Sequence, residues 1–258
     1  LLSLSLSLLR LAPEGMATLS PHKETDLFQV SAGGDMVFDA TLVPTDDLRY
    51  LPPQLNVFAS RHDPEANTML LDREIADRFK TNFTAMMYHV DLESGAEEHG
   101  ANHSILLRAI SLEIMRPIFA RHQAIELEDE LFIFYESSDA VLAVLEARVA
   151  IAKYNTGLSA ETAINKLVID GWGIHHGSMI FVEGTDIHWG DPVNTASKLG
   201  QDLATDNDLL ISSVVHGLCK DHHKVSGKRV VFEPRLLKRS GVDFPCFCVS
   251  MPEDGVAP

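Results

Sequence analysis

Beyond residue 81 the chain alternates short strand-like segments with long helical ones, and this order restricts the folds open to it. Residues 83–92 (FTAMMYHVDL) are rich in strand formers and end at an acid, whereas residues 103–122 carry apolar residues at helical spacing. Pro117 should bend or break that helix, because it lacks a backbone N–H. Residues 123–135 (QAIELEDELFIFY) alternate up to an acidic tip and then become apolar, which predicts a β-hairpin.

The later segments complete an α+β pattern. Residues 137–157 predict a second long helix, capped by a Ser or Asp and ended by Gly157. Residues 166–184 (KLVIDGWGIHHGSMIFVEG) predict two strands that meet near Gly177. A third helix, a strand with a short helix, and closing strands follow. Residues 81–252 therefore predict β-α-β-β-α-β with added elements, an α+β sandwich with helices on one face of a sheet.

The first eighty residues predict no comparable order. Residues 1–15 (LLSLSLSLLRLAPEG) precede Met16, and their apolar run is too short to span a bilayer. They have no basic stretch in front and no clear cleavage site, so we expect translated upstream sequence, with a truncated targeting peptide as the alternative. Residues 16–80 contain several prolines and predict an N-terminal extension and linker, in which residues 71–80 (LDREIADRFK) could make one short helix. Residues 253–258 predict a tail.

The charge balance excludes some functions. Lys and Arg number 21 against 37 Asp and Glu, a formal net charge of −16, which disfavours binding to nucleic acid or to an anionic membrane. An anionic ligand would need a local positive pocket or divalent cations. Cys219, Cys246 and Cys248 cannot form a complete disulfide framework, which indicates a reducing, cytoplasmic compartment. Cys246 and Cys248 share one face of a strand, where they should simply pack.

Two acids are candidate metal ligands. Asp91 ends the first predicted strand and Asp129 sits at the hairpin tip, so both carboxylates could converge at one edge of the sheet. Two close carboxylates repel each other unless they are protonated or bridged by a cation, and such hard oxygen ligands suit Mg²⁺ or Mn²⁺. Taken alone, however, an acid at a strand end and another in a turn are also what solvated loops contain.

A second candidate region is the turn and helix WGDPVNTASKL (residues 189–199). Asp191 can cap the helix and Pro192 then occupies its first position. Asn194 and Lys198 are four residues apart and share a face. An amide and an ammonium beside a helix N-terminus could grip a ribose and a phosphate. The alternative is an amphipathic helix whose polar face meets water.

Four segments, in this order, resemble the catalytic domain of class III nucleotidyl cyclases: AMMYHVDLES, IELEDELFIFYESSDAV, GWGIHHGSM and WGDPVNTASKL. The piece GDPVNTASKL is the most specific, and the likeness covers roughly residues 81–252. It implies a ferredoxin-like βαββαβ sandwich with an antiparallel sheet and helices. It also implies a head-to-tail homodimer, or a heterodimer with a related cyclase domain, with active sites between the protomers.

The resemblance implies roles for individual residues. Asp91 and Asp129, helped by the backbone carbonyl of Leu92, would bind two divalent ions, Mg²⁺ or Mn²⁺, that hold the triphosphate of ATP or GTP. The ribose 3′-hydroxyl would then attack the α-phosphate and expel pyrophosphate. Asn194 from the opposite protomer would orient the ribose, and Lys198 takes the place of an Arg that stabilises charge on the transferred phosphate.

This sequence departs from the family pattern around the phosphates. Lys198 keeps the charge of the family's Arg but loses its planar fork. Glu128 replaces the Gly that usually precedes the second metal ligand, and Glu130 follows, so three acids stand together. Those acids could sharpen metal binding or crowd out the triphosphate. Ser94 stands where the family has a Gly in the loop that wraps the triphosphate, with Gly95 next.

The base-reading positions also differ. The purine-selecting Lys is replaced by Ile125, which on a regular strand would face the same way as residue 129. The second purine contact is Ile187, and Asp186 is one residue out of register. His188 is then the residue in this turn to test for a base contact. These positions leave ATP and GTP open as substrates, with ATP favoured.

Three functions remain. The leading hypothesis is a nucleotidyl cyclase that converts ATP to cyclic AMP in cyclic nucleotide signalling. The alternative is a pseudo-cyclase that binds a nucleotide or a partner cyclase domain and regulates without turnover, and a third hypothesis is other phosphoryl chemistry on a triphosphate. The pairs His175–His176 and His222–His223 are interpreted as structural or surface groups, because adjacent strand residues point to opposite faces and cannot easily chelate a metal.

Overall fold

The computed structural model describes residues 28–30, 36–38, 55–61, 63–91, 100–128, 130–185, 187–239 and 241–251. The chain divides into two compact units, Leu1–Arg78 and Phe79–Pro258. The described elements of the first unit are a strand pair, β1 (Phe28–Val30) with β2 (Met36–Phe38), and the helices α1 (Asn56–Ser60) and α2 (Thr68–Phe79). The short helix expected at residues 71–80 is thus part of α2, while most of the predicted linker lies outside the described residues.

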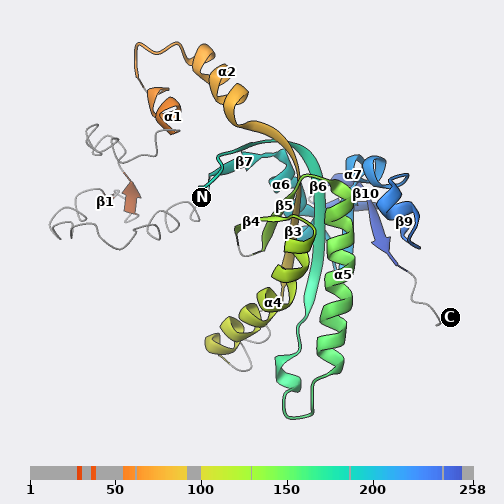
Figure 1. Ribbon diagram of the computed structural model, residues 1–258. Coiled ribbons are helices and arrows are strands. Elements are labelled where there is room, and N and C mark those ends of the chain that lie inside the picture. Colours follow the sequence, from red (N-terminus) through yellow and green to blue (C-terminus); the bar gives the residue numbers. More distant parts are fainter. Residues whose placement is uncertain are drawn as a thin grey trace. The chain divides into compact units, whose positions relative to one another are not determined.

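The second unit is built on an eight-stranded sheet (Figure 1). Its path is β4-β5-β3-β6-β8-β10-β9, with β7 paired to β6. All neighbours are antiparallel except β6 and β8. This confirms the predicted α+β class, the hairpin and the closing strands. The bounds are β3 (Lys80–Val90), β4 (Ile125–Glu128), β5 (Leu131–Phe134), β6 (Ile169–Phe181), β7 (His188–Gly190), β8 (Asp208–Ser212), β9 (Val231–Arg239) and β10 (Val242–Ser250).

One face of this sheet is covered by the long helices α4 (Ala101–Arg121) and α5 (Ser137–Thr156), which lie beside β6 in Figure 1. The shorter α7 (Ser213–Cys219) and α8 (His223–Ser226) pack into the same core, and η5 (Ala163–Asn165) is a single 3₁₀ turn before β6. The aromatic residues of this core lose all or nearly all their exposure to water, which supplies much of the apolar burial that stabilises the fold. They are Tyr88, Phe119, Phe132, Phe134 and Trp172.

The opposite face carries α6 (Asp191–Ser197) and the π-helical η6 (Lys198–Leu203). Ala196 packs there with Phe83 and Ala85, whereas Met86 belongs to the core beneath α5. Successive strand residues point to opposite faces, so β3 serves both layers. The prediction of helices on one face is therefore wrong for α6, because the alternation in β3 and β6 gives each face an apolar surface to bury.

A row of small residues on β6 brings α6 and η6 close to the sheet. Gly171, Gly173 and Gly177 alternate on the face toward these helices. A Cβ atom added to Gly173 would lie 2.1 Å from the carbonyl oxygen of Ala196 and 2.3 Å from the backbone nitrogen of Gly200. Helix and strand therefore meet backbone to backbone, which only glycine permits.

Gly177 does not separate two strands as the sequence suggested. The β3–β6 ladder runs without interruption from the pair Lys80–Ile180 to the pair His89–Gly171. An added Cβ at Gly177 would lie 3.3 Å from the Pro192 ring. The glycine thus makes room for the start of α6, and one thirteen-residue strand replaces the two that were expected.

Two predictions about the long helices need correction. Pro117 neither breaks α4 nor ends it, because the buried Met115, Ile118 and Phe119 hold the turns on both sides of the proline against the core. At α5 no side chain caps the N-terminus, although Gly157 is the C-cap as predicted. The Ser137 hydroxyl instead lies 2.8 Å from the Thr84 hydroxyl and ties the helix to β3.

The cysteines are free thiols, as expected, and the strand-borne pair packs as predicted. Cys246 and Cys248 lie in a small apolar cluster with Leu199 of η6. Burial raises the pKa of the Cys219 thiol to about 12, so this thiol stays protonated at neutral pH. Among the described helices, none is both long enough and apolar enough to cross a membrane.

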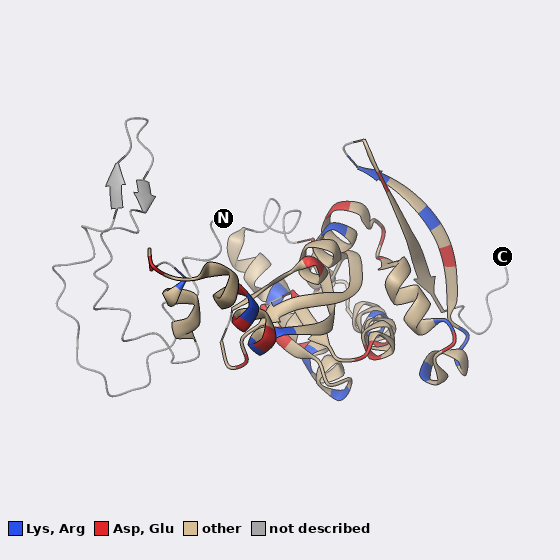
Figure 2. Ribbon diagram, turned by 90° about the horizontal axis from the view of Figure 1, so that it is seen from above, with Lys and Arg blue, Asp and Glu red and all other residues tan. Residues whose placement is uncertain are grey.

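The end strands form a ribbon that leaves the body of the sheet. β10 pairs with β9 along its whole length but with β8 only from Cys246 to Cys248. The half of β10 around Phe244 is therefore held by β9 alone, and Figure 2 shows the ribbon extending outward. This places Phe244 beyond the last strand of the central sheet.

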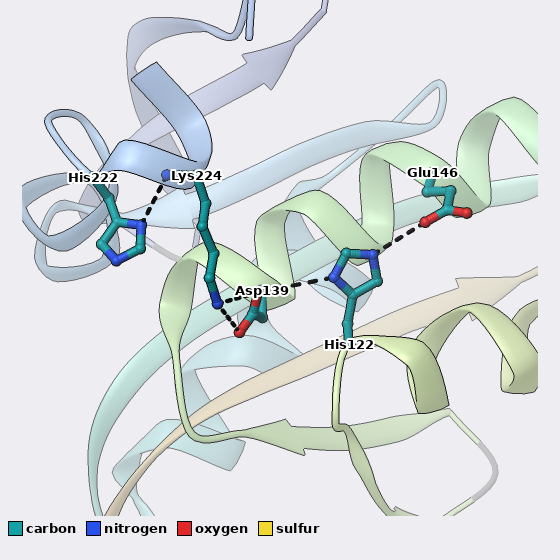
Figure 3. Close-up of polar contacts among 5 residues, drawn as sticks. All are labelled: His122, Asp139, Glu146, His222 and Lys224. Carbon is teal, nitrogen blue, oxygen red and sulfur yellow. Dashed lines mark hydrogen bonds and ion pairs between the residues drawn. The ribbon is translucent and has the colours of Figure 1, made fainter. Parts of the chain in front are cut away.

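A polar network joins the helical layer, as Figure 3 shows. His122, just after α4, lies between two acids of α5: its Nε2 is 3.1 Å from Glu146 and its Nδ1 is 3.9 Å from Asp139. Lys224 of α8 donates to both Asp139 oxygens at 2.9 and 2.7 Å. The hydrogen bonds from His122 and from Arg121 hold the pKa of Glu146 below its usual value.

This network predicts an acid-dependent loss of stability. A lowered folded-state pKa means that the ionised Glu146 stabilises the fold above its unfolded pKa, and that this contribution disappears as the pH falls through the folded pKa. Glu146→Gln should lower the free energy of unfolding at pH 7 by less than about 1 kcal/mol, because the side chain is partly exposed. In denaturant titrations the difference between the variant and the wild type should be larger at pH 7 than at pH 3. The exposed Glu113→Gln on α4 is the control, and an equal effect of both variants at pH 7 would contradict the role of the network.

The glycine row predicts a sharp difference between two Gly→Ala substitutions. Gly173→Ala should lower the free energy of unfolding by about 3 kcal/mol, because the new methyl group meets backbone atoms that cannot yield. Gly217→Ala in α7 has open space around it and should be neutral or stabilising by up to about 1 kcal/mol. Denaturant unfolding followed by the fluorescence of Trp172 and Trp189 measures both. Similar stabilities for the two variants would show that the helix can move away from the strand.

Candidate functional site

The first candidate ligand, Asp91, lies directly after β3 with its backbone N–H donating to the Val168 carbonyl at 3.0 Å. Asp170 of β6 lies at the same edge. Burial and then the negative charge of Asp91 raise the pKa of Asp170. The edge therefore holds two mutually repelling carboxylates, of which the sequence indicated one.

The other two candidate ligands, Leu92 and Asp129, lie outside the described residues, as do Ser94 and Gly95 of the adjacent loop. The acids that flank Asp129 are described, and they face different partners. The Glu130 carboxylate lies 3.7 Å from Arg108 and 3.8 Å from His89, and its side chain is only 15% exposed. The Glu128 carboxylate lies 3.8 Å from His188 Nε2. Among these neighbours Arg108 carries a permanent positive charge, which offsets part of the negative charge of the three acids.

The base-reading positions lie on β4 and beside β7. Ile125 is half-buried and packs with the cluster around Ile133. The register of β4 shifts between Glu126 and Glu128, so β4 is not the regular strand that the even-number rule requires, and residue 129 itself lies outside the described residues. Ile187 is exposed, and Asp186 lies outside the described residues. His188 is largely buried and faces Glu128.

The first turn of α6 differs by one residue from the sequence prediction. Gly190 is the N-cap, Asp191 and Pro192 open the helix, and no side chain caps it. The Asp191 carboxylate instead receives hydrogen bonds from His175 Nε2 at 2.9 Å and from the Thr195 hydroxyl at 3.1 Å. The cap prediction is thus wrong, because the histidine of β6 competes for that carboxylate.

The two neighbouring histidines of β6 do point to opposite faces, as predicted. His175 lies between Asp191 on one side and Ser212 Oγ, 2.8 Å from its Nδ1, on the other. His176 Nδ1 lies 2.9 Å from the Thr84 hydroxyl on the α5 side of the sheet. The pair therefore cannot hold one ion between them.

Asn194 and Lys198 share one face of the helix, as predicted, since the Lys198 N–H donates to the Asn194 carbonyl. Asn194 is exposed to solvent. The Lys198 ammonium lies 4.4 Å from the centre of the Phe244 ring of β10, a cation–π contact that restrains an otherwise flexible side chain. Lys198 also begins the π-helical segment, a feature often found at functional sites.

Within one chain, Asn194 and Asp91 lie at different heights along the sheet. The helix residues on either side of Asn194 approach Gly177 and Gly173, which pair with Phe83 and Met87 of β3. Asn194 therefore lies level with a part of β3 that is four to eight residues before Asp91, or roughly 13 to 26 Å of strand. One copy of the chain does not bring the two candidates together.

The donor set at the Asp91 edge suits a hard divalent cation. Asp91 and Asp170 supply carboxylate oxygens, and their mutual repulsion would be relieved by a positive ion. No group of three or more His, Cys, Asp or Glu residues is arranged to hold a metal among the residues that the structure describes, which exclude Leu92 and Asp129. The match between this edge of the sheet and a divalent cation therefore rests on the type of ligand atom that Asp91 and Asp170 supply.

Solved structures define the class of this fold. A structure titled adenylate/guanylate cyclase/hydrolase from Silicibacter pomeroyi matches with a TM-score of 0.54 and 17% identity over 68% of this chain and 98% of that chain. An adenylate cyclase from Trypanosoma brucei matches at 0.51 and 13% identity over 68% and 91%. The guanylate cyclase domain from Catenaria anguillulae, solved with GTP, matches at 0.50 and 14% identity over 67% and 97%.

The second unit thus has the fold of class III adenylate/guanylate cyclase catalytic domains. No protein-family model matches the sequence, and no curated protein matches it. The fold occurs in structures titled as adenylate and as guanylate cyclases, so it does not distinguish the two purine bases.

Three features of the site were missed by sequence reasoning. Asp170 reaches Asp91 only through the register in which Val90 pairs with Ile169. Phe244 meets Lys198 across more than forty residues of sequence. The third is the hydrogen bond from His175 to Asp191. The motif GIHHG did contain a signal for it, since the odd-numbered face of that strand carries glycines and a single histidine.

Proposed function

We propose that the second unit is the catalytic domain of a nucleotidyl cyclase, which converts ATP or GTP to a cyclic nucleotide and pyrophosphate in cyclic nucleotide signalling. The observation that carries the proposal is the split between two half-sites on one cyclase-type fold. Asp91 stands at one level of the sheet, and Asn194 with Lys198 stands at another. Two copies placed head to tail, or one copy with a related cyclase domain, would join complementary halves.

In the first half-site, Asp91, Asp129 and the Leu92 carbonyl would hold two divalent ions, Mg²⁺ or Mn²⁺. These ions would neutralise the triphosphate and make the ribose 3′-hydroxyl easier to ionise. The negative charge of Asp91 reaches Asp170 and, after burial, raises the pKa of that carboxyl, so a cation bound at Asp91 would be favoured by both carboxylates. Arg108 and His89 face Glu130, which keeps that carboxylate away from the triphosphate.

In the second half-site, supplied by the opposite protomer, the exposed Asn194 amide would hydrogen-bond the ribose and orient its 3′-hydroxyl toward the α-phosphate. Lys198, held over Phe244, would place its ammonium beside the oxygens that gain negative charge. The 3′-hydroxyl would give its proton to water as its oxygen forms a bond to the α-phosphorus, the bond from that phosphorus to the bridging oxygen would break, and pyrophosphate would leave with that oxygen. The leading form is an adenylate cyclase, although Ile125 and Ile187 offer no hydrogen bond to either purine.

The second candidate function is a pseudo-cyclase that binds a nucleotide or a partner cyclase domain as a regulatory module. Two features favour it. The side chains of Ile125 and Ile187 are apolar, and the Lys198 ammonium is a point charge that lacks the planar fork of an Arg guanidinium. In that case this chain would contribute one half-site to a partner that supplies the other.

The decisive experiment is complementation between two inactive variants of the full chain. With Mn²⁺ and ATP or GTP, the wild type should release cyclic nucleotide and pyrophosphate, while Asp91→Ala and Asn194→Ala alone should lose at least 100-fold in turnover. A mixture of the two should recover up to about a quarter of the wild-type rate, because half of randomly formed dimers are mixed and each holds one complete site. The measurement is chromatographic quantification of cyclic product.

Two outcomes would contradict the proposal. Metal-dependent nucleotide binding without product from the wild type would favour the pseudo-cyclase. Activity that survives in the Asp91→Ala and Asn194→Ala variants would place the chemistry elsewhere. The exposed Glu113→Ala on α4 serves as the matched control and should leave turnover unchanged.

The Lys198 substitution predicts a gain of function. Lys198→Arg should raise turnover about tenfold, equivalent to about 1.4 kcal/mol, because a guanidinium can contact two phosphate oxygens and still stack on Phe244. Steady-state kinetics measure the change, with Lys153→Arg on α5 as the control. A loss of turnover in Lys198→Arg would show that the site accommodates an ammonium beside the phosphate and not the larger guanidinium.

A further inference from the structure

The helix that carries Asn194 and Lys198 is held by one buried histidine. On the face of β6 beneath α6 and η6, the odd-numbered residues from 171 to 177 are three glycines and His175. His175 is 8% exposed and is therefore the single side chain that this stretch of β6 directs toward the helix. Its two ring nitrogens reach two different elements, Asp191 at the start of α6 and Ser212 at the end of β8.

The hydrogen bonds around His175 define its tautomer. The Asp191 carboxylate can only accept, so Nε2 carries the ring proton and donates a hydrogen bond to it. Nδ1 of the neutral ring then accepts from the Ser212 hydroxyl, whose oxygen in turn accepts from the Val215 N–H at 3.3 Å and so caps α7. In the series Val215, Ser212, His175 and Asp191, each residue thus donates a hydrogen bond to the next. The series leads from the N-terminus of α7 to the first residue of α6.

We propose that His175 is a positioning residue: through Asp191 it sets the position of α6, and thereby aims Asn194 and Lys198 at the nucleotide. This inference rests on the proposed function, because it assumes that α6 supplies the second half-site. His175 itself touches neither the ribose nor the phosphates.

The length and packing of α6 make such a support necessary. α6 has seven residues before it continues into the π-helical η6, and no side chain caps its start, so its own hydrogen bonds hold that start weakly. Ala196 and the half-buried Val193 pack against Phe83 and Ala85, but the part of β6 beneath the helix is a row of glycines that offers no side chain to fix the rotation of the helix. Asp191 and Asn194 are three residues apart, about 4.5 Å along the axis, so any movement at Asp191 is passed on to the amide. Misplacement by about 1 Å can cost about 100-fold in rate.

Two substitutions of His175 separate its two hydrogen bonds. Gln reaches as far as Nε2 and can keep the bond to Asp191, whereas Asn reaches only as far as Nδ1 and keeps the bond to Ser212. Asp191→Ala removes the hydrogen bond to His175 from the other side. The Asp191 side chain is 74% exposed, so this substitution carries little risk of unfolding. His176→Asn is the matched control, because His176 bonds to Thr84 on the other face of the sheet.

The mixed dimers described above test the role in one half-site at a time. In such a dimer the Asp91→Ala chain supplies α6 and the Asn194→Ala chain supplies the metal ligands. His175→Asn or Asp191→Ala in the chain that supplies α6 should lower kcat 10- to 100-fold with little change in KM. The same substitutions in the other chain should change kcat less than twofold. His175→Gln and His176→Asn should stay within about threefold of the parent in either chain.

Equal losses from both chains would overturn the proposal, because they would show general damage to the fold. Full activity of His175→Asn and Asp191→Ala in the α6-supplying chain would overturn it too. Amide hydrogen exchange provides a readout without turnover: the amides of residues 193–198 should exchange at least tenfold faster in His175→Asn and Asp191→Ala than in His175→Gln. If the wild type makes no cyclic product but these two variants still exchange faster, the proposed function alone is wrong. If their exchange is unchanged, the positioning role is wrong.

Discussion

The backbone contact between β6 and the helix pair α6–η6 is the constraint on which the rest of the second unit depends. Gly171, Gly173 and Gly200 carry no Cβ atom where strand and helix meet, so the helix lies within van der Waals distance of the strand backbone. This contact turns one sheet into the middle of three layers. It also places Asn194 and Lys198 on a face that the long helices α4 and α5 leave uncovered.

A helix packed on glycines gains proximity but loses the interlocking side chains that normally prevent sliding. The structure compensates with specific contacts at the start and at the middle of the helix pair. His175 bonds to Asp191 at the start, and the Lys198 ammonium rests on Phe244 near the junction with η6. Polar contacts therefore supply the positional precision that apolar packing supplies on the other face, where Trp172 and Tyr88 are fully buried.

Much of the architecture could be predicted from local pattern. The hairpin at 125–134, the C-terminus of α5 at Gly157 and the helix after Gly190 follow from alternation, helical spacing and turn residues. The failures occur where a long-range partner competes with a local rule. Asp191 bonds to His175 rather than capping α6, and Pro117 does not break α4, because the core holds the turns on both sides of it.

The sequence by itself determined the α+β class, the order of the strands and helices along the chain, and the shared face of Asn194 and Lys198, because these depend on residues close together in sequence. Only the tertiary structure decided that Asp170 stands beside Asp91, that Phe244 underlies Lys198 and that one chain keeps Asn194 apart from Asp91. Each of those relations depends on strand register and on helix placement. Both are set by contacts between segments distant in sequence, which local periodicity does not encode.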